Sequence, residues 1–406
     1  MIMMLIRMAW KNIWRNPTRS LVILLSVAAG LFAGITVLSL YKGMMQNRVR
    51  TVIYEETGHI QVHQKGFTAE MDPALFIDQP MKVLQKLQQD TSIAAISCRT
   101  VAAGMISNAR GSSGIQLLGI NPRSEDKTSN LSEKIHEGER AQTLDHKGIL
   151  VGRKLAKKMG LALGKKVVIT LTDTTDEMIA SAFRIKGIYQ SSNAPLDEVT
   201  VYMTDTALQE MLTLHGSMHE ISIVLKQEDD LLPMVTKLRN EFPSLAIETW
   251  KDLSPETALM VNTMDYYSYI ILIIILIALS FGIMNTMMMA VLERKKEISR
   301  MMALGMSSQQ LRLMIMTETV FLAIIGIPLA LCLSFLTIRH YAKTGIDMSG
   351  MREEMMQSFG FSTTIYPSYP TEKIFPILLL VLATAILSSI VPMIKTSQIN
   401  TSTALQ

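Results

Sequence analysis

The sequence has little charge, few aromatic residues and almost no cysteine. Charged residues make up 18% of the 406 residues and hydrophobic residues 49%, whereas charged residues are about 25% of an average soluble domain. The two cysteines, Cys98 and Cys332, fall in segments assigned below to different phases, so we expect no disulfide bridge between them. These properties exclude a disordered chain, a collagen-like chain and a disulfide-stabilised scaffold. They favour a protein that is partly membrane-embedded and partly water-soluble.

Long apolar runs predict four transmembrane helices. A bilayer core needs about 20 apolar residues in a helix, and four runs reach that length, with Glu318 as the only charged residue in them. A buried core helix can imitate one such run but not four. The first run follows a basic N-terminus, as a signal peptide would, but it exceeds an h-region of about 7–15 residues, so we interpret it as uncleaved. The predicted spans are residues 20–41, 269–292, 313–338 and 374–394.

The distribution of lysine and arginine predicts the orientation of these spans. Residues 1–19, 293–312 and 395–406 together contain ten basic and two acidic side chains. The long segment 42–268 contains 25 basic and 28 acidic residues, and 339–373 contains four of each. Because short basic segments stay on the cytoplasmic side, we expect both termini and segment 293–312 inside, and segments 42–268 and 339–373 outside.

The N-terminal 19 residues predict an amphipathic entry helix on the inner leaflet. Four basic residues recur at every fourth position, which aligns them on one helical face, and two tryptophans lie beside them. Pro17 is expected to separate this helix from the first span. An ordinary positively charged anchor would share these features. The residues are Arg7, Lys11, Arg15 and Arg19, with Trp10 and Trp14.

The outside segment reads as an α/β domain with an insertion. Two stretches repeat a pattern of strand, amphipathic helix and strand, with period 2 flanking period 3.6. The first covers 59–63, 80–89 and 92–98, and the second 220–226, 231–241 and 245–250. The insertion, roughly 99–204, is rich in short β runs with Gly and Asn-Pro turns. The predicted fold class is therefore an α-helical membrane domain of four transmembrane helices, with a large α/β domain between helices one and two. That domain combines a βαβ-repeat subdomain with a β-rich insertion.

No motif in the sequence predicts catalysis or a bound cofactor. The stretch Gly160–Lys166 resembles a phosphate loop, but it has one residue too few between its glycines and a lysine where Ser or Thr should hold magnesium. We interpret it as a turn before a strand. His215 and His219 lack the glutamate of a zinc-protease helix, and His59 and His63 lack a third ligand. We therefore predict no catalytic residue, no metal site, no cofactor bound by this chain and no nucleic-acid partner.

The cytoplasmic connection between spans two and three predicts a docking element. A charged turn, Glu293–Glu297, follows the second span without a helix breaker, so we expect the helix to continue into water. Ile298, Met301 and Met302 then form a small apolar face, and Gly305 ends the helix before Ser307 or Ser308 caps the next one. Such a hairpin fits a groove on a soluble partner. A plain solvated loop would explain the charges but not the apolar face.

Several stretches resemble the FtsX/MacB superfamily of ABC transporter permeases (type VII). The stretch ERKKEISRMMALGMSSQQL, followed by TETVFLAIIGIPLA, is similar to the superfamily signature, and AWKNIWRNPTRS is similar to its entry helix. The C-terminal VPMIKTSQINTSTALQ resembles its closing segment, although Thr396 and Ser402 depart from the pattern. GHIQVHQKGF, LLGINPRSED, ILVGRKLAKKMGLALGKKV and ETWKDLSP are similar to the Lol-type (LolC/LolE-like) lipoprotein-releasing permeases.

The resemblance implies a permease subunit in the bacterial cytoplasmic (inner) membrane that pairs with a second permease copy, identical or different. A separate dimer of ABC ATPase subunits would hold ATP and magnesium. The large domain would be periplasmic, and lipoprotein or another lipophilic cargo would pass to a periplasmic acceptor by mechanotransmission, without crossing the bilayer through a pore. Residues implied to couple to the ATPase are Glu293, Arg294, Glu297, Ile298, Met301, Ala303, Leu304 and Gly305.

Two further assignments concern the spans. We expect Glu318, which is about one and a half turns from Arg312, to reach the inner interface at the cytoplasmic end of its span, as a helix-packing or coupling residue and not a proton carrier. The resemblance implies that acyl chains enter between spans one and two at their outer ends, although ordinary interfacial packing with a tyrosine belt is equally compatible. The implied cargo contacts are Leu38, Tyr41, Met45, Tyr267, Ile271 and Leu272.

Two alternative functions remain open at this point. Some members of the superfamily use the same movement to activate cell-wall hydrolases, as FtsX-like signalling devices. Others, which are MacB-like, export peptides or drugs. The size of segment 42–268 favours transport, since the division-linked members have smaller outside domains.

Overall fold

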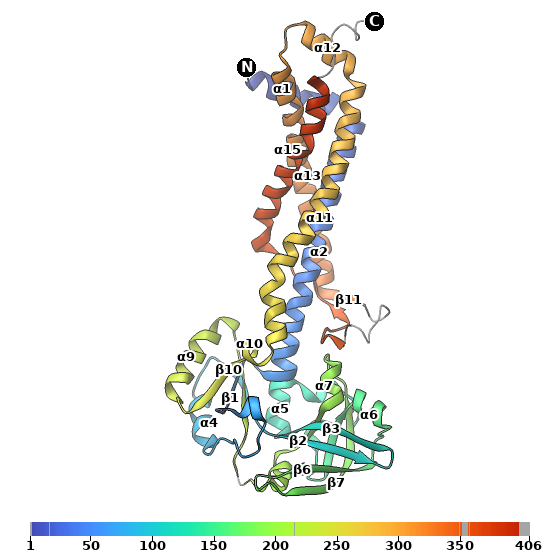
Figure 1. The fold of residues 1–406 in the computed structure, drawn as a ribbon. Helices are drawn as coiled ribbons and strands as arrows, with labels where there is room; N and C mark the ends of the chain where they lie inside the picture. Colours follow the sequence, from blue (N-terminus) through green and yellow to red (C-terminus); the bar gives the residue numbers. More distant parts are fainter. Residues whose placement is uncertain are drawn as a thin grey trace. The chain divides into compact units, whose positions relative to one another are not determined.

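The computed structural model describes residues 2–15, 17–214, 216–348, 350, 356 and 358–397. His215 and the predicted tail from Gln398 onward lie outside the described residues. The chain divides into two compact units. The helical unit comprises the residues up to Met45, Asn262–Ile346 and the residues from Ile365 onward, and the mixed unit comprises Gln46–Val261 and Asp347–Thr364. Figure 1 shows the elements of both.

Four helices of the helical unit are long and apolar enough to cross a membrane. They have 35, 39, 37 and 27 residues, whereas a bilayer core needs about 20. Residues 42–51 and 255–268, which the sequence analysis assigned to the outside domain, are therefore helical extensions of the first two spans. Hydrophobicity falls at the membrane boundary, but a helix continues until its backbone is capped. The helices are α1 (Ile2–Arg15), α2 (Pro17–Thr51), α11 (Pro255–Glu293), α12 (Lys295–Ala303), α13 (Ser308–Thr344) and α15 (Thr371–Ser397).

Glycines on α2 let α11 pack closely against it. A Cβ atom on Gly30 would lie 3.0 Å from Leu279, and one on Gly34 would lie 3.8 Å from Leu272 and Ile275. These glycines are four residues apart and so share one helical face. Small residues at this spacing allow the close approach on which helix association in membranes depends. The α2–α11 interface is thus determined largely by the absence of side chains on α2.

Helix α1 lies across the α12 end of the helical bundle (Figure 1). It ends at Arg15, and α2 begins at Pro17, where the sequence predicted the break. Ala9 and Ile13 are buried, and the Trp10 ring packs edge-on against Phe321 of α13, with ring centroids 5.7 Å apart. Trp14 is 65% exposed. The helix therefore has one face on the bundle and one free for the membrane interface, as an in-plane amphipathic helix requires.

The mixed unit contains two βαβ segments whose strands interleave in one sheet (Figure 1). The strand order is β10-β1-β9-β2, and every neighbouring pair in it is antiparallel. Strand β9 therefore lies between the two strands of the first segment, and β1 lies between the two strands of the second. This is the split βαβ arrangement of ferredoxin-like folds. The elements are β1 (Ile60–Gln64), α4 (Pro80–Gln88), β2 (Ile93–Asn108), β9 (Glu220–Leu225), α9 (Leu231–Glu241) and β10 (Leu245–Thr249).

The β-rich insertion closes into a barrel. Strand pairing runs β2-β3-β8-β5-β7-β6 and returns from β6 to β2. The inward side chains of these strands, together with those of α6 and α8, form a separate apolar core that extends to Leu214, beyond the predicted end of the insertion at 204. Its strands are β3 (Gly111–Ile120), β5 (Gly148–Gly152), β6 (Lys166–Thr172), β7 (Met178–Tyr189) and β8 (Thr200–Thr204), with β4 (Ile135–Gly138) pairing outside β7. The helices are α5 (Pro122–Ser129), α6 (Arg153–Met159), α7 (Ala194–Val199) and α8 (Asp205–Met211).

Short elements complete the mixed unit. A six-residue π-helix, η1, directly follows α2, and α10 directly precedes α11. Val52 and Ile53 of η1 are buried against Trp250 of α10. The remaining elements are η1 (Val52–Thr57), α3 (Phe67–Glu70), η2 (Leu131–Lys134), η3 (Ala141–Thr143), η4 (Glu228–Asp230), α10 (Trp250–Leu253) and the paired strands β11 (Ile346–Asp347) and β12 (Thr364–Ile365).

Strand β2 belongs to both parts of the mixed unit, and Arg99 lies where it passes from one to the other. Arg99 pairs in register with Glu220 of β9 and with Ile120 of β3. Its guanidinium is buried and forms ion pairs of 2.7 Å with Glu125 of α5 and with Glu220. It also donates a hydrogen bond of 3.1 Å to the carbonyl of Glu56 in η1. A single side chain thus joins η1, the split βαβ sheet and the barrel.

Replacing Arg99 should destabilise the protein more than any surface arginine. We expect Arg99→Met to lower the free energy of unfolding by about 3–5 kcal/mol, because two buried carboxylates would lose their cation. The measurement is the thermal unfolding midpoint of the purified full chain in detergent. Arg123→Met, at an exposed position of α5, is the matched control and should change little. Adding Glu125→Gln and Glu220→Gln to Arg99→Met should recover part of the loss, and an unchanged midpoint for Arg99→Met alone would refute this role.

Candidate functional site

The connection between α11 and α13 is a short helix with a break on each side. Helix α11 ends at Glu293, Arg294 has non-helical angles (φ −96°, ψ 15°), and α12 begins at Lys295. The expectation that the span continues without a break into this segment is therefore wrong. At the other end Gly305 has φ +96°, a conformation that favours glycine. Ser307 then caps α13 through a reciprocal capping box with Gln310.

Arg294 turns back from this break towards the helical bundle. Its Nη1 atom lies 3.3 Å from Oε1 of Glu318, and its Nε atom lies 3.2 Å from Oε2 of Glu297. Glu318 is buried, and Arg294 is 12% exposed at its side chain. The pair closes one side of a small cavity lined by apolar side chains such as Met287, Met314 and Ile315. The break at Arg294 therefore places its guanidinium where the single charge of the third span needs it.

The structure pairs Glu318 with Arg294, the residue between α11 and α12. Arg312 is six positions before Glu318 on α13, and because a helix turns about 100° per residue, the two lie about 120° apart around the helix axis. The role of Glu318 as a helix-packing or coupling residue stays a prediction. The sequence feature that could have identified this pair is the requirement of a buried carboxylate for a cation. Arg294 follows the end of α11 and is the arginine that meets Glu318.

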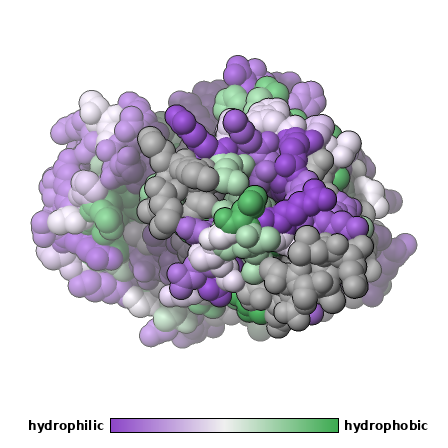
Figure 2. Space-filling model, turned by 90° about the horizontal axis from the view of Figure 1, so that it is seen from above, coloured by the Kyte–Doolittle hydropathy of each residue, from purple (hydrophilic) through white to green (hydrophobic). Residues whose placement is uncertain are grey.

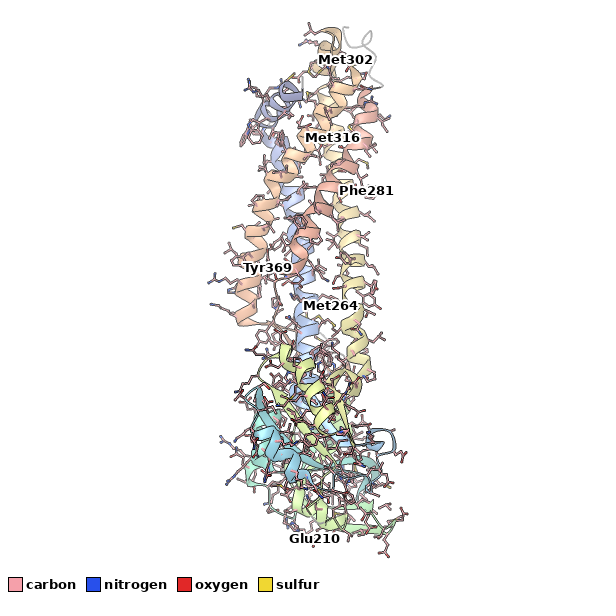
Figure 3. All side chains as sticks on the ribbon, turned by 90° about the vertical axis from the view of Figure 1, so that its left-hand side faces the viewer. Glu210, Met264, Phe281, Met302, Met316 and Tyr369 are labelled. Carbon is pink, nitrogen blue, oxygen red and sulfur yellow. The ribbon has the colours of Figure 1, made fainter. Side chains whose placement is uncertain are left out.

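The apolar face of α12 packs partly on its own chain. Ile298 is 4% exposed and belongs to the core of the helical unit, with Met301, Met302 and Met306 partly buried against it. Met302 lies at one end of the bundle and Met264 towards the other (Figure 3). Ile298 is therefore not available for docking, whereas Met301 and Met302 keep part of their surface exposed. The burial of Ile298 fixes how α12 lies on the bundle.

The outward side of this connection is basic with one large apolar residue. Leu304 is 90% exposed, and the exposed residues around it are Glu293, Lys295, Lys296, Arg300, Ala303 and Gly305. Figure 2 views the molecule from the end where α12 lies, and it shows mostly hydrophilic side chains with small hydrophobic areas among them. An exposed leucine with polar residues nearby has the composition of a protein–protein interface hot spot, in which an apolar anchor is surrounded by a polar rim.

Helix α1 contacts α12 through a second ion pair. Arg15 forms a salt bridge with Glu297. Partial burial acts to raise the pKa of Glu297, but hydrogen bonds from Arg15 and Arg294 outweigh it and hold the pKa below its usual value. Glu297 is therefore ionised at neutral pH and joins α1 to the break at Arg294. Because both partners are about half exposed, this pair orients α12 more than it stabilises it.

The six predicted cargo contacts do not form one open surface. Leu38, Met45 and Leu272 are buried, Tyr41 and Ile271 are half-buried, and Tyr267 is 54% exposed. Leu38 and Leu272 share the core of the helical unit. The α2–α11 seam is therefore closed at its centre.

The segment Ile365–Pro370 packs against the predicted outer part of α2. A Cβ atom on Gly43 would lie 2.1 Å from the carbonyl oxygen of Tyr366, so only glycine fits there. The amide of Ser368 donates to the carbonyl of Ser39 at 3.1 Å, and Lys42 forms an ion pair of 2.8 Å with Glu372. This segment covers one side of α2.

The histidines singled out in the sequence serve the fold. His59 accepts a hydrogen bond of 3.2 Å from the amide of Leu225, and His219 accepts one of 3.1 Å from the amide of Val101. His63 is hydrogen-bonded to Gln61 at 3.0 Å. In the part of the chain that the structure describes, no group of three or more His, Cys, Asp or Glu side chains is arranged to hold a metal ion.

The glycine-rich stretch Gly160–Lys166 forms the turn between α6 and β6, as interpreted from the sequence. Gly160 and Gly164 have φ of +63° and +76°. Because these conformations favour glycine, they account for both glycines without a bound phosphate.

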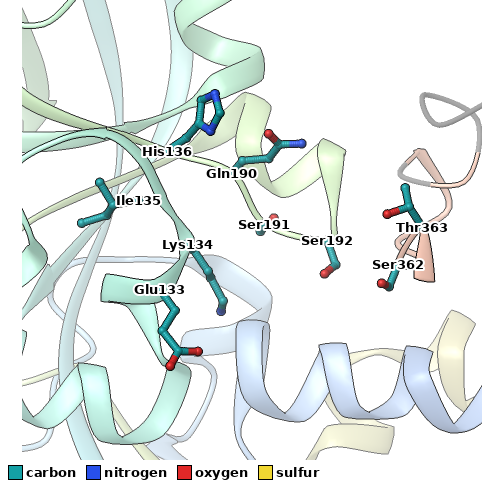
Figure 4. A pocket seen from close by; sticks show the side chains of 9 residues that line it. All are labelled: Glu133, Lys134, Ile135, His136, Gln190, Ser191, Ser192, Ser362 and Thr363. Atoms are coloured by element: carbon teal, nitrogen blue, oxygen red, sulfur yellow. The ribbon is translucent and has the colours of Figure 1, made fainter. Parts of the chain in front are cut away.

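A polar pocket of about 330 Å³ lies in the mixed unit. His136 and Gln190 lie on one side of it, and Ser362 and Thr363 lie on the other (Figure 4). Burial lowers the pKa of Lys134, which also lines it, and the nearby carboxylate of Glu55 opposes that effect. The lining is mostly polar, with Ile135 as the apolar residue among the nine that line it.

Family models match most of the chain. The model for the FtsX-like permease C-terminal domain matches residues 269–401. The model for the MacB-like periplasmic core domain matches residues 20–241, which is more than half of the chain.

Individual relatives are distant. The chain is 23% identical over 332 residues to an uncharacterized ABC transporter permease protein of Mycobacterium tuberculosis, a match that covers 80% of this chain and 36% of that protein. It therefore spans about a third of that relative's length. It is 22% identical over 345 residues to the lipoprotein-releasing system transmembrane protein LolC of Buchnera aphidicola, with 82% of each chain covered. The periplasmic region of MacB from Actinobacillus actinomycetemcomitans superposes with a TM-score of 0.36 and 13% identity, over 51% of this chain and 94% of that one.

Removing Glu318 should release α12 from the bundle. In a background without the two native cysteines, Ile298→Cys should resist a maleimide reagent in the purified protein, whereas Leu304→Cys should react. We expect Glu318→Ala to make the cysteine at position 298 reactive, because Arg294 would lose its buried partner, at a cost of about 3–5 kcal/mol. Exchanging the charges, with Arg294→Glu and Glu318→Arg together, should restore protection. Equal protection of position 298 with and without Glu318 would show that the pair does not hold α12.

Proposed function

Since this chain belongs to the FtsX/MacB superfamily of ABC transporter permeases, we propose that it transmits the movement of a separate ATPase dimer to its extracytoplasmic domain. In this proposal the connection from Glu293 to Gly305 is the coupling element, and ATP and magnesium are held by the partner. The observation that carries it is the Arg294–Glu318 pair, together with the burial of Ile298 and the exposure of Leu304 in the same connection. A short helix that is held on the bundle by an ion pair and buried side chains, and that exposes an apolar side chain to a partner, can transmit the partner's movement to the spans.

The division of roles within the coupling element follows from burial. Leu304, Ala303 and Gly305 are exposed and are the proposed contacts with the ATPase groove. Ile298 and Met301 hold α12 on the bundle, and Arg294 connects it to α13. Glu297 adds α1 through Arg15, so movement of α12 would also move the entry helix. Packed side chains and ion pairs transmit displacement because they resist separation.

We propose lipoprotein or another lipophilic molecule as the cargo. Relatives from Buchnera, Haemophilus and Neisseria carry the name lipoprotein-releasing system transmembrane protein. The predicted spans contain Glu318 as their only charged side chain, whereas a hydrophilic pathway would need several polar groups facing inward. Because Leu38 and Leu272 are buried together, cargo contact at the α2–α11 seam would require the seam to open. A permease dimer and a periplasmic acceptor complete this proposal.

The proposed location is the inner membrane, with both termini and α12 in the cytoplasm and the mixed unit in the periplasm. The excess of lysine and arginine in residues 1–19 and 293–312 supports this orientation.

Changing the exposed leucine should weaken ATPase binding without unfolding the protein. We expect Leu304→Asp to reduce the ABC ATPase that co-purifies with the tagged chain by about tenfold or more, since burying a leucine contributes about 1.5–3 kcal/mol. Mass spectrometry identifies the ATPase and any lipoprotein in the same sample. Leu232→Asp is the matched control, because Leu232 is 75% exposed on α9 of the mixed unit. Equal ATPase recovery from Leu304→Asp and wild type would remove Leu304 from the interface, and co-purification of a peptidoglycan hydrolase without lipoprotein would favour the signalling alternative.

The orientation predicts opposite labelling of two exposed positions in whole cells. In the cysteine-free background, Met178→Cys, at a residue that is 80% exposed in β7, should react with a maleimide that does not cross membranes. Leu304→Cys should react only after the cells are opened. Labelling of position 304 in intact cells would invert the topology and with it the proposed docking side.

A further inference from the structure

A second cavity of the mixed unit, of about 530 Å³, lies where η1, α3 and α10 meet the strands β1, β2 and β3. Its walls combine carboxylates with aromatic and aliphatic side chains. Phe67 of α3 and Val101 of β2 are buried, and Leu118 and Leu196 add half-buried apolar surface. Glu248 and Asp252 supply carboxylates beside this surface. The cavity therefore has both acidic and apolar residues in its lining.

Three of the five acids that line this cavity have cations of their own. Glu220 pairs with Arg99 at 2.7 Å, and Glu56 pairs with Arg48 at 2.6 Å. Glu55 lies 3.9 Å from the ammonium of Lys134 and accepts hydrogen bonds from the backbone and hydroxyl of Ser192. The one arginine in the wall, Arg99, is fully used by Glu125 and Glu220. These groups leave no positive charge for the remaining acids.

Glu248 and Asp252 are the acids without a cation. Among the residues that the structure describes, no lysine or arginine lies within ion-pair distance of either one. The Oε2 atom of Glu248 is buried without a hydrogen-bond partner, 3.9 Å from the Nε2 atom of His63. His63 is 2% exposed, and its Nδ1 atom also has no partner. A buried carboxylate oxygen without a partner is costly and calls for a donor.

His63 does not supply the missing positive charge. Burial lowers the pKa of His63 to about 4, although the carboxylate of Glu248 acts to raise it. The imidazole is therefore neutral at pH 7, and it stacks on Phe67 with ring centroids 5.6 Å apart. Phe67 in turn stacks on His219 at 5.1 Å. His63 and Phe67 of this stack line the cavity and contribute uncharged rings beside the carboxylate of Glu248.

We propose that this cavity binds a protonated primary amine carried on an aliphatic stem. The ammonium would lie against Glu248, with Asp252 at the mouth, and the stem would lie along Phe67, Leu118 and Leu196. An ammonium supplies the donors that a carboxylate accepts. A lysine side chain of a peptide and a free alkylamine both have this chemistry. The site is separate from the coupling element and does not depend on the proposed function.

Calorimetric titration of the purified full chain, without an ATPase, tests this assignment. The probes are pentylamine with pentanol as its neutral counterpart, and acetyl-Gly-Lys-Gly-amide with the norleucine peptide as its counterpart. We expect an amine to bind about tenfold or more tightly than its neutral counterpart, which is about 1.4 kcal/mol. Tighter binding of the lysine peptide identifies a peptide segment as the natural source, and tighter binding of pentylamine identifies a small amine.

Two variants make the assignment falsifiable. Glu248→Gln should weaken amine binding about tenfold, whereas Glu228→Gln, at an exposed position of η4, should leave it unchanged. Leu196→Trp should abolish binding because the larger side chain fills the cavity, and it tests the proposal if Glu248→Gln does not fold. The proposal is overturned if neither amine binds, if neutral counterparts bind as tightly, or if amine binding is undiminished in folded Glu248→Gln or folded Leu196→Trp.

Discussion

A charge buried away from water must have an opposite charge beside it, because an unpaired one costs several kcal/mol. This constraint decides the arrangement of both units. In the helical unit the single charge within the third span, Glu318, draws Arg294 out of helical geometry and so determines where α11 ends and α12 begins. In the mixed unit Arg99 is buried and gathers Glu125 and Glu220 from two subdomains. Neither arrangement is explained by hydrophobic packing alone.

The coupling element depends on the first of these pairs. Arg294 is directed into the bundle, and the apolar side of α12 faces the same way. Ile298 is therefore part of the core of the helical unit. What remains outside is a basic rim with Leu304 at its tip. The residues that the sequence suggested for docking thus fall into two groups. One group packs α12 against the bundle, and the other is exposed for contact with a partner. A coupling element needs both groups of residues. A residue that contacts the ATPase can move the spans only if its helix is packed firmly against them.

The mixed unit uses the second network to join parts that belong to different sheets. Strand β2 runs for 16 residues through the split βαβ sheet and into the barrel, so the two parts share backbone as well as side chains. The π-helix η1 adds a third connection, since Glu55 and Glu56 bond to Ser192 and Asn193 of the barrel subdomain. π-helical turns are rare overall, but those that do occur are often found at functional sites. The acids left over from these networks, Glu248 and Asp252, line the cavity to which we assign amine binding.

The sequence by itself determined the four apolar helices, the two βαβ segments and the β-rich insertion, because hydrophobic periodicity is a local property of the chain. It also located the stop at Gly305 and narrowed the following cap to Ser307 or Ser308, of which the structure uses Ser307, because single residues decide backbone geometry there. The tertiary structure alone decided the partner of Glu318, the inward direction of Ile298, the interleaving of β1 and β9, and the closure of the barrel. Each of these joins residues far apart in sequence, and a buried charge or strand edge accepts any partner that the packing brings near.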